Sequence, residues 1–376
     1  MAVTADTVRE QLKSIQGPDG KDLVASSKLS DIVVTDGKVF FSLTVDAAQA
    51  EAWEAVRKHA EAAVRAIPGV ASVLVALTAE RAGRAGSPPP RGAPARPGAQ
   101  AGAAPTGQAR AVPGIEFVIA VASGKGGVGK STTAVNLALG LRDLGMKVGV
   151  LDADIYGPSM PRLLAVKTKP EMIGGHTLRP VEAYGMKVMS IGFLVDEETP
   201  MIWRGPMVMS AITQMLREVD WGMLDILVVD MPPGTGDAQL TLAQQVPLAG
   251  AVIVSTPQDL ALIDARRGIA MFRRVDVPVL GLVENMSYFL CPHCGKRTDI
   301  FSHGGAKAEA EKQGVPFLGE VPLEAVIRET SDAGLPVVAT RPDSPHAQVY
   351  REIASRVRAE LKRGGARTAP KIVIEN

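Results

Sequence analysis

The sequence predicts an α/β protein: a doubly wound, mostly parallel sheet preceded by a small α+β domain. Three observations support this. Apolar runs alternate with helical stretches over the last two thirds of the 376 residues, which is typical of strands covered on both faces. A glycine-rich motif directly follows the first of these runs. A segment dominated by Ala, Gly and Pro separates this region from the N-terminal 80 residues.

The segment 81–114 divides the chain. Of its 34 residues, 24 are Ala, Gly or Pro, five are Arg and none is acidic. Because this composition buries too little apolar surface to offset the entropy of ordering, we expect a disordered linker. The predicted organisation is a small domain over residues 1–80, the linker over 81–114, a large domain over 115–362 and a polar tail over 363–376.

The small domain is predicted to have the element order α-β-β-α-β. Val8, Leu12 and Ile15 recur at helical spacing. Residues 32–45 are typical of a hairpin around Asp36-Gly37. A second helix is expected over residues 47–67 and a last strand over 70–77, which gives a compact α+β unit of about 80 residues.

The large domain contains a series of apolar runs that predict buried parallel strands. Such strands lack the alternation of polar and apolar residues because both of their faces are covered. The stretches between most of the runs have helical patterns, as expected for a doubly wound sheet. The runs lie at residues 117–122, 148–151, 226–229, 251–254, 279–283 and 317–321.

The first strand leads into a phosphate-binding motif. Its residues are Gly124-Lys125-Gly126-Gly127-Val128-Gly129-Lys130-Ser131-Thr132, which match G-x-x-x-x-G-K-[ST]. The glycines let backbone N–H groups converge on phosphate oxygens, while Lys130 adds positive charge and the Ser131 hydroxyl can ligate Mg²⁺. A helix over about residues 132–144 contributes the positive end of its dipole. The motif predicts a P-loop NTPase, and the lack of an Asn-Lys-x-Asp sequence favours ATP over GTP.

Three carboxylates follow predicted strands. Strand alternation places Asp152 and Asp154 on the same side, at the carboxyl edge of the sheet where ligands bind. Asp230 ends another buried strand, which is the Walker B position that holds Mg²⁺ directly or through water. The alternative for each aspartate is the cap of a following helix. The loop Pro232-Pro233-Gly234 after Asp230 suits a switch that senses the γ-phosphate.

The chain has two cysteines, Cys291 and Cys294. They exclude a disulfide scaffold and indicate a reducing compartment. Two thiolates at this spacing can hold one metal, but zinc or a [4Fe–4S] cluster normally takes four protein ligands. Either histidines complete the set, with His293 and His303 nearest in sequence, or a second chain supplies another pair at a twofold axis. A redox dithiol and a structural zinc are the alternatives.

Composition limits the expected partners. The 41 Lys and Arg balance 40 Asp and Glu, and aromatic residues make up only 4%. Neither charge nor stacking side chains therefore predict binding to nucleic acid or an anionic membrane. Because the sequence has no run long enough to span a bilayer and no secretory signal, we expect a cytoplasmic location and no membrane partner.

A second lysine near the start of the phosphate loop, Lys125, makes the motif resemble the deviant Walker A motif of the dimeric SIMIBI-class ATPases. That class includes the MinD/ParA proteins, the nitrogenase iron protein and the Mrp/ApbC proteins. The resemblance implies that Lys125 acts in catalysis across a dimer interface, on nucleotide bound by the partner, while Lys130 acts within its own chain. An exposed loop lysine is the alternative.

The same resemblance implies roles for four further residues. Asp154 would position the attacking water, Asp152 would support Mg²⁺, and Asp230 would bind the ion through water. Asn285, at the end of a late strand, would contact the adenine.

Residues 114–362 are similar to the Mrp/ApbC (NBP35-like) iron–sulfur carriers. The matching stretches include the phosphate loop, Asp152-Ala-Asp-Ile-Tyr-Gly-Pro-Ser, Trp203-Arg-Gly-Pro-Met, Asp230-Met-Pro-Pro-Gly-Thr-Gly-Asp, Thr256-Pro-Gln, Glu284-Asn-Met-Ser and Cys291-Pro-His-Cys. The resemblance implies that Cys291 and Cys294 hold a [4Fe–4S] cluster at a dimer interface. The small domain resembles the MIP18-like family (domain of unknown function 59), although Thr44-Val-Asp-Ala stands where members often have Thr-Pro-x-Cys.

The leading hypothesis is a homodimeric ATPase that delivers a [4Fe–4S] cluster to apo iron–sulfur client proteins, with scaffold proteins as a further class of partner. One rival is a positioning ATPase of the MinD/ParA kind. Another is a zinc-stapled interaction protein whose assembly is gated by ATP.

Overall fold

The computed structural model describes residues 3–80 (without 19, 27, 31, 36, 47–48 and 71), 111–173, 177–194 and 205–365. The chain divides into two compact units, one with the N-terminal residues and one with the large sheet. Most of the predicted linker (81–110), most of the polar tail (366–376) and Trp203-Arg204 lie outside the described residues. At the end of the predicted linker Val112 is buried, so the chain is already packed there.

The N-terminal unit is a three-stranded sheet with two helices. Its strands are β1 (Val33–Thr35), β2 (Lys38–Asp46) and β3 (Ser72–Glu80), and its helices are α1 (Ala5–Leu12) and α2 (Ala50–Arg65). The order is β1-β2-β3, antiparallel between β1 and β2 and parallel between β2 and β3. Val8, Leu12 and Trp53 are completely buried in its core.

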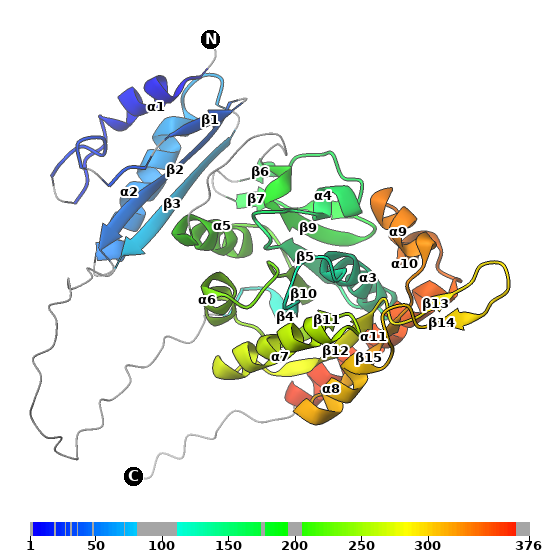
Figure 1. Ribbon diagram of the computed structural model, residues 1–376. Helices are drawn as coiled ribbons and strands as arrows, with labels where there is room; N and C mark the ends of the chain where they lie inside the picture. The colour runs from blue at the N-terminus through cyan, green and yellow to red at the C-terminus, as the bar shows by residue number, and fades with distance from the viewer. Residues whose placement is uncertain are drawn as a thin grey trace, which may run out of the picture. The chain divides into compact units, whose positions relative to one another are not determined.

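The second unit is organised around an eight-stranded sheet in the order β15-β12-β11-β4-β10-β5-β9-β8 (Figure 1). Every neighbouring pair is parallel except β8 and β9. The strands are β4 (Ile115–Ala122), β5 (Val148–Asp152), β8 (Val181–Ala183), β9 (Met186–Ser190), β10 (Leu224–Asp230), β11 (Gly250–Ser255), β12 (Val279–Asn285) and β15 (Phe317–Val321). The predicted doubly wound, mostly parallel sheet with a small preceding α+β domain is confirmed.

Helices connect the strands and cover the sheet. They are α3 (Lys130–Asp143), α4 (Met160–Leu163), α5 (Gly205–Arg217), α6 (Asp237–Gln245), α7 (Asp259–Arg274), α8 (Gly305–Gln313), α9 (Ala325–Asp332), α10 (Val337–Thr340) and α11 (Pro345–Gly365), with a 3-10 turn at Ile191–Phe193. Two short hairpins lie outside the sheet: β6 (Glu171–Ile173) with β7 (Thr177–Arg179), and β13 (Phe289–Leu290) with β14 (Arg297–Thr298). None of the helices in the described ranges is long and apolar enough to cross a membrane.

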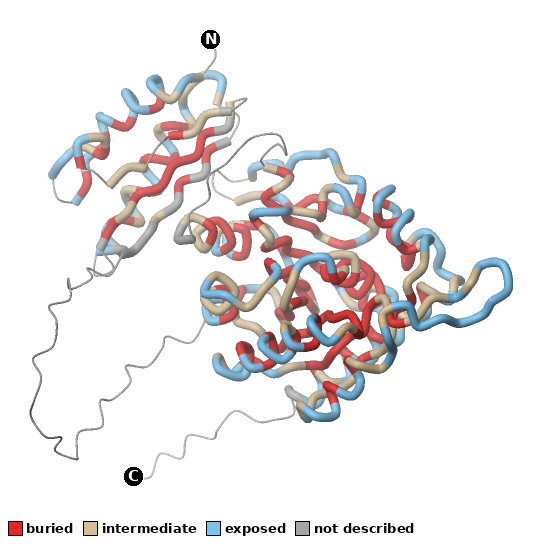
Figure 2. The backbone as a smooth tube through the Cα atoms, in the orientation of Figure 1, coloured by how far each residue is buried: buried red, intermediate tan, exposed pale blue. Residues whose placement is uncertain are grey.

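The core explains why the strand sequences are continuously apolar. Ile226 and Val228 of β10 belong to a buried cluster with residues of α3 and α11, and the intervening Leu227 and Val229 are equally buried on the opposite face. The central strands are buried along almost their whole length (Figure 2). Each large apolar side chain buried in this way contributes about 1.5–3 kcal/mol of transfer free energy.

Because the strands are parallel, their carboxyl ends meet at one edge of the sheet. The phosphate loop follows β4, Asp152 ends β5, Asp230 ends β10, and Asn285 ends β12 just before the cysteine hairpin. Loops at this edge form the ligand sites of open α/β sheets. The fold therefore gathers nearly all of the predicted site residues from segments that are far apart in sequence.

Replacing Ile119, at the centre of β4, should destabilise the large unit. The Ile119 side chain is completely buried, so Ile119→Ala leaves a cavity and should lower the free energy of unfolding by about 2–5 kcal/mol. Urea unfolding of the full chain measures the change. The control is Leu260→Ala, at a side chain that is 73% exposed and should change stability by less than about 0.5 kcal/mol. Equal effects of the two substitutions would contradict the assignment of the core.

Candidate functional site

A pocket of about 260 Å³ opens where β4 leads into α3. Since a single water needs about 10–15 Å³ of such a cavity, the pocket has room for phosphate groups and a hydrated ion. Most of its lining comes from the predicted phosphate loop: Lys125, Gly126, Gly127, Gly129, Lys130, Ser131 and Thr132. The remaining lining residues are Ser123, Asp154, Ser159, Leu163 and Pro233.

Two glycines of the phosphate loop are required because a side chain at either position would collide with a neighbouring element, and not only because they give phosphate access to the backbone. Gly129, which caps α3, has φ of 81° in the left-handed region, and a Cβ there would lie 2.2 Å from Nδ2 of Asn285. A Cβ at Gly124 would lie 2.4 Å from the backbone of Asp264 in α7. The loop is therefore held tightly between β12 and α7, with no space for side chains at these positions.

Lys130 and Asp230 form a buried ion pair at the base of the pocket. Lys130 Nζ donates to Asp230 Oδ1 at 2.6 Å and lies 3.1 Å from Ser131 Oγ. Asp230 is completely buried, and its second oxygen, Oδ2, has no hydrogen-bond partner among the described residues. A buried carboxylate oxygen without a partner is costly, so this atom marks a place where a further ligand is expected.

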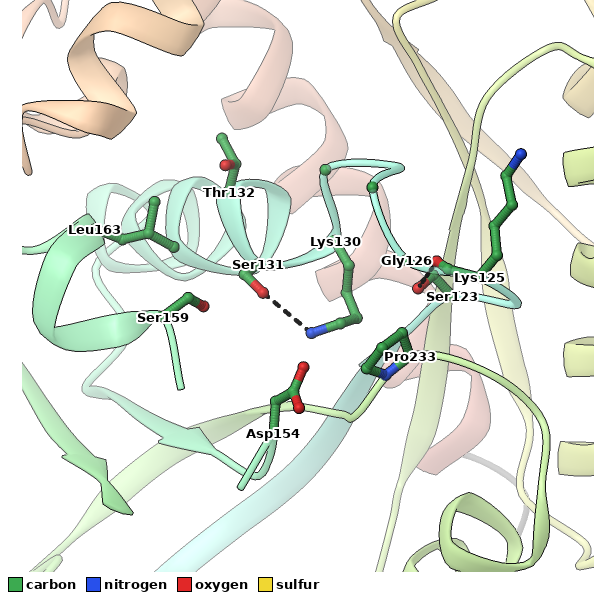
Figure 3. Close-up of a pocket in the computed structure, with 12 residues that line it drawn as sticks. Ser123, Lys125, Gly126, Lys130, Ser131, Thr132, Asp154, Ser159, Leu163 and Pro233 are labelled. Carbon is green, nitrogen blue, oxygen red and sulfur yellow. Dashed lines mark hydrogen bonds between the residues drawn. The ribbon is translucent and has the colours of Figure 1, made fainter. Parts of the chain in front are cut away.

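The oxygen atoms around Lys130 fit a magnesium ion. Mg²⁺ prefers oxygen ligands and keeps several waters. The Ser131 hydroxyl and the Asp154 side chain face the same space in the pocket (Figure 3). Asp230, which bonds to Lys130 through Oδ1, has no partner for Oδ2 among the described residues. These residues would hold Mg²⁺, which in such sites neutralises charge that develops on the phosphates.

Asp152 is completely buried and is surrounded by hydrogen-bond donors. Its carboxylate accepts from the backbone N–H groups of Asp154, Ser159 and Met160 at 3.2, 3.0 and 3.1 Å, and from the Ser190 hydroxyl at 2.9 Å. The bonds to Ser159 and Met160 cap the start of α4, which is the capping role considered as the alternative for each aspartate. Its predicted support of Mg²⁺ stays a prediction, and the bonds show how it fixes the loop that carries Asp154.

The two aspartates of this loop share an unusual electrostatic environment. Burial, and after it the neighbouring Asp230 carboxylate, raise the pKa of Asp152 to about 7, although hydrogen bonds from Met160 and Ser190 act in the opposite direction. Burial also raises the pKa of Asp154, while Lys130 lowers it in part. The Asp154 carboxylate points toward Lys130 in the pocket (Figure 3).

Lys125 is one of the residues that line the pocket, and its backbone carbonyl accepts from Ser123 Oγ at 2.9 Å. Its side chain extends away from Lys130 and Asp154 (Figure 3). Asn285 is buried outside the pocket lining, where its Nδ2 donates to the carbonyl of Val128 at 2.8 Å. The predicted adenine contact of Asn285 stays a prediction, and the structure assigns this residue a contact with the phosphate loop.

Cys291 and Cys294 lie between β13 and β14, and both are free thiols. The turn is closed by Cys291 N–H donating to the Lys296 carbonyl at 3.0 Å and by Gly295 N–H donating to the Cys291 carbonyl at 2.7 Å. Hydrogen bonds from the backbone of Cys294 and His293, then from the Cys294 thiol, lower the pKa of Cys291. The hairpin therefore favours a thiolate, which is the form that ligates metal.

Among the described residues, no three His, Cys, Asp or Glu side chains are grouped closely enough to hold a metal ion. His303, one of the two histidines considered for completing the cysteine site, instead contacts Arg297 and Ser287.

Sequence reasoning missed three lining residues: Ser123, Ser159 and Leu163. Ser159 could have been found from the sequence, because it is the last residue of the matching stretch Asp152-Ala-Asp-Ile-Tyr-Gly-Pro-Ser. Its Oγ is buried and has no partner within the described part of the chain. Pro233, from the predicted switch loop, does line the pocket, and Gly234 beside it has φ of 103°.

The raised pKa of Asp152 predicts how stability depends on pH. Between about pH 4 and pH 7 the unfolded chain has lost this proton and the folded chain keeps it, so stability falls as the pH rises. Asp152→Asn removes this contribution. The melting temperature of the wild type, measured relative to Asp152→Asn without nucleotide or Mg²⁺, should therefore decrease from about pH 5 to about pH 8. A difference that is constant with pH would contradict the assignment.

Comparison with known proteins agrees with this geometry. Residues 114–358 match the sequence model of the ParA family described as NUBPL iron-transfer P-loop NTPase, and residues 5–75 match that of iron–sulfur cluster assembly proteins. The iron–sulfur cluster carrier protein of Synechocystis is 43% identical over 368 residues, which are 96% of this chain and 98% of the relative. The iron–sulfur cluster transfer protein NUBPL of Dictyostelium discoideum is 56% identical over 254 residues, 67% of this chain and 79% of the relative.

A solved structure is similar as well. It is a nucleotide-binding protein of Archaeoglobus fulgidus in complex with ADP and with cobalt, with 42% identity and a TM-score of 0.55, covering 62% of this chain and 91% of that one. The predicted resemblance to the Mrp/ApbC carriers is confirmed. The family match covers most of the chain and includes the phosphate loop and the cysteine hairpin, and the chain thus belongs to the NUBPL iron-transfer family of P-loop NTPases.

Proposed function

We propose that this protein is an ATP-hydrolysing carrier that holds a [4Fe–4S] cluster, as its cargo, between two copies of the chain and delivers it to apo iron–sulfur proteins. The observation that carries the proposal is the exposed Cys291/Cys294 hairpin. It offers two thiols, with no third ligand grouped near them in the described ranges, at the same sheet edge as the phosphate loop. A second copy would supply the two missing ligands.

ATP would bind with its phosphates over the pocket between β4 and α3. The residues assigned to it are Gly124, Lys125, Gly126, Gly127, Val128, Gly129, Lys130, Ser131 and Thr132, with Asn285 close by. Ser131 would ligate Mg²⁺, Asp230 would bind it through water, and Asp152 would support the site by fixing the Asp154 loop. The ADP bound by the Archaeoglobus relative supports this assignment.

Hydrolysis requires positioning and charge neutralisation more than a strong base. A water held by Asp154 would attack the γ-phosphorus, and the bond to the bridging oxygen would break to release ADP and phosphate. Lys130 would stabilise the phosphate oxygens from its own chain. Lys125 would do so on the partner's nucleotide, which is consistent with a side chain that extends away from its own pocket.

The cargo site follows from the chemistry of the hairpin. Cluster iron is held by thiolates, and the lowered pKa of Cys291 favours that form. Both cysteines of the chain are in this hairpin, so the N-terminal domain has no thiol with which to hold cargo. The homodimer, the apo client proteins, the scaffold partners and the cytoplasmic location are parts of the same proposal.

The family match favours the carrier over the rival of a MinD/ParA-type positioning ATPase. The carrier and the zinc-stapled interaction protein differ in what the cysteines bind, and metal analysis separates them.

The cysteine pair should be essential for cargo. Protein purified without oxygen and reconstituted with iron and sulfide should hold about four irons per dimer, with charge-transfer absorption at ~400 nm. The double variant Cys291→Ala/Cys294→Ala should lose both signals while keeping its affinity for ATP. A colourless wild-type protein that contains stoichiometric zinc would refute the cluster assignment.

Lys125 should act between chains. Lys125→Ala and Lys130→Ala should each lower the rate of ATP hydrolysis by on the order of 10²-fold or more. Each substitution removes a positively charged side chain that would stabilise the transferred phosphate. Mixing the two inactive variants should restore activity, since one site in a mixed dimer then has both lysines. Lys125→Ala with full activity, or mixtures that stay inactive, would contradict action in trans.

A further inference from the structure

Two sets of polar contacts, joined through the backbone of Glu284 and Asn285 in β12, connect the phosphate loop to the cysteine hairpin. It begins where Asn285 Nδ2 donates to the Val128 carbonyl of the loop at 2.8 Å. Glu284, the preceding residue of β12, projects to the opposite face because strand side chains alternate. The end of β12 thus contacts the backbone of the phosphate loop through Asn285 and a separate polar cluster, on the other face, through Glu284.

Glu284 is completely buried and organises that cluster. Its carboxylate accepts from the Ser287 hydroxyl at 2.6 Å, from Gly304 N–H at 3.0 Å and from Ala306 N–H at 2.7 Å. The last two bonds fix the start of α8 beside β12. They also fix the position of His303, which directly precedes this turn.

His303 connects the buried cluster to the hairpin. Arg297 Nη2 lies 2.7 Å from His303 Nδ1, and because a guanidinium can only donate, Nδ1 must accept and carry no proton. The ring proton then belongs on Nε2, which faces Glu320 Oε1 at 3.7 Å. The Ser287 hydroxyl, which donates to Glu284, lies 3.1 Å from the same Nδ1.

Arg297 belongs to β14, the strand that follows the cysteines. It pairs with Leu290, the residue directly before Cys291. Its guanidinium also stacks on the Tyr288 ring at 4.4 Å and donates from Nε to Asp299 at 3.0 Å. The cysteine hairpin extends from the sheet beyond β13 and β14 (Figure 1), and Arg297 connects it to the buried cluster.

We propose that Arg297 and His303 are positioning residues that fix the cysteine hairpin relative to the phosphate loop, so that nucleotide at the loop changes the affinity of the cysteines for their cargo. The inference rests on the proposed function and adds the route by which its two sites influence each other. A ligand that shifts the Val128–Asn285 contact moves the end of β12 and, through Glu284 and His303, the hairpin. By linkage, cargo must change nucleotide affinity by the same factor.

The test measures this coupling with Co²⁺ as the probe for the thiolates. The Kd of Co²⁺ is determined anaerobically in the full chain, with and without a saturating non-hydrolysable ATP analogue and Mg²⁺. The wild-type ratio of the two Kd values should lie in the range of ~5–150-fold that is typical of coupled sites. The Kd of the analogue, measured with and without Co²⁺, should change by the same factor.

Two variants and two controls decide the assignment. Arg297→Gln and His303→Ala should bring the ratio to within about two-fold of one, while leaving the affinity for nucleotide alone unchanged. Lys296→Gln removes a positive charge from the same hairpin without touching His303 and should keep the wild-type ratio. His303→Asn, whose amide oxygen replaces the Nδ1 acceptor, should restore most of the coupling.

A merely structural role gives a different result. If Arg297→Gln weakens Co²⁺ binding equally with and without nucleotide, the ratio is preserved and the proposal is overturned. It is also overturned if the wild-type ratio is one, or if Lys296→Gln abolishes coupling as strongly as Arg297→Gln. Wild-type protein whose cysteines hold neither Co²⁺ nor a reconstituted cluster would overturn the proposed function together with this inference, whereas binding without coupling overturns the inference alone.

Discussion

The ion pair between Lys130 and Asp230 is the interaction on which the site depends. Both side chains are almost completely removed from water, so neither charge can be buried without the other. The pair is nevertheless incomplete, because Asp230 Oδ2 has no partner among the described groups and Lys130 reaches only one carboxylate oxygen and the Ser131 hydroxyl. Phosphate oxygens would offer Lys130 further acceptors, and a cation would neutralise the Asp230 carboxylate. The incomplete ion pair thus lowers the stability of the folded chain without ligand, and bound phosphate and a cation would recover it.

The parallel sheet determines what surrounds this pair. Asp152 and Asp230 are register partners at the ends of adjacent strands, so two carboxylates are forced together in the interior. The protein meets that cost at Asp152 with four donors, three of them backbone N–H groups of the following loop. Those same bonds fix the backbone that presents Asp154 to the pocket. The donors that offset the contact between Asp152 and Asp230 therefore also order the loop that carries Asp154, the residue assigned to the water under the proposed function.

The sequence predicted the sheet, the phosphate loop and the acidic strand ends, because each has a local pattern: continuous apolar runs, glycine spacing, and an aspartate after a buried strand. It missed β9, which pairs with β5 in parallel, and β8, which is joined to β9 at Tyr184-Gly185 and pairs with it antiparallel. It also missed the cluster of Glu284, His303 and Arg297. These residues are up to 19 positions apart and meet only because β12, the hairpin and the start of α8 pack together. Such tertiary packing leaves no periodic pattern in the sequence from which it could be predicted.

The two sites differ in how firmly they are built, and the difference suits a carrier. Lys130 and Asp230 lie in buried structure at the ends of the central elements, where prearranged groups stabilise charge best. Cys291 and Cys294 lie on a turn between two-residue strands, and Cys294 is exposed. Under the proposed function this accessible position would let a cargo be both received and given up. Under the proposed function each chain contributes half of the thiolates. The affinity for cargo would therefore depend steeply on the relative position and orientation of the two hairpins. A small rotation of the hairpin, transmitted through Arg297, would then be enough for the cysteines to release a cargo that they had retained. The hairpin would not need to unfold.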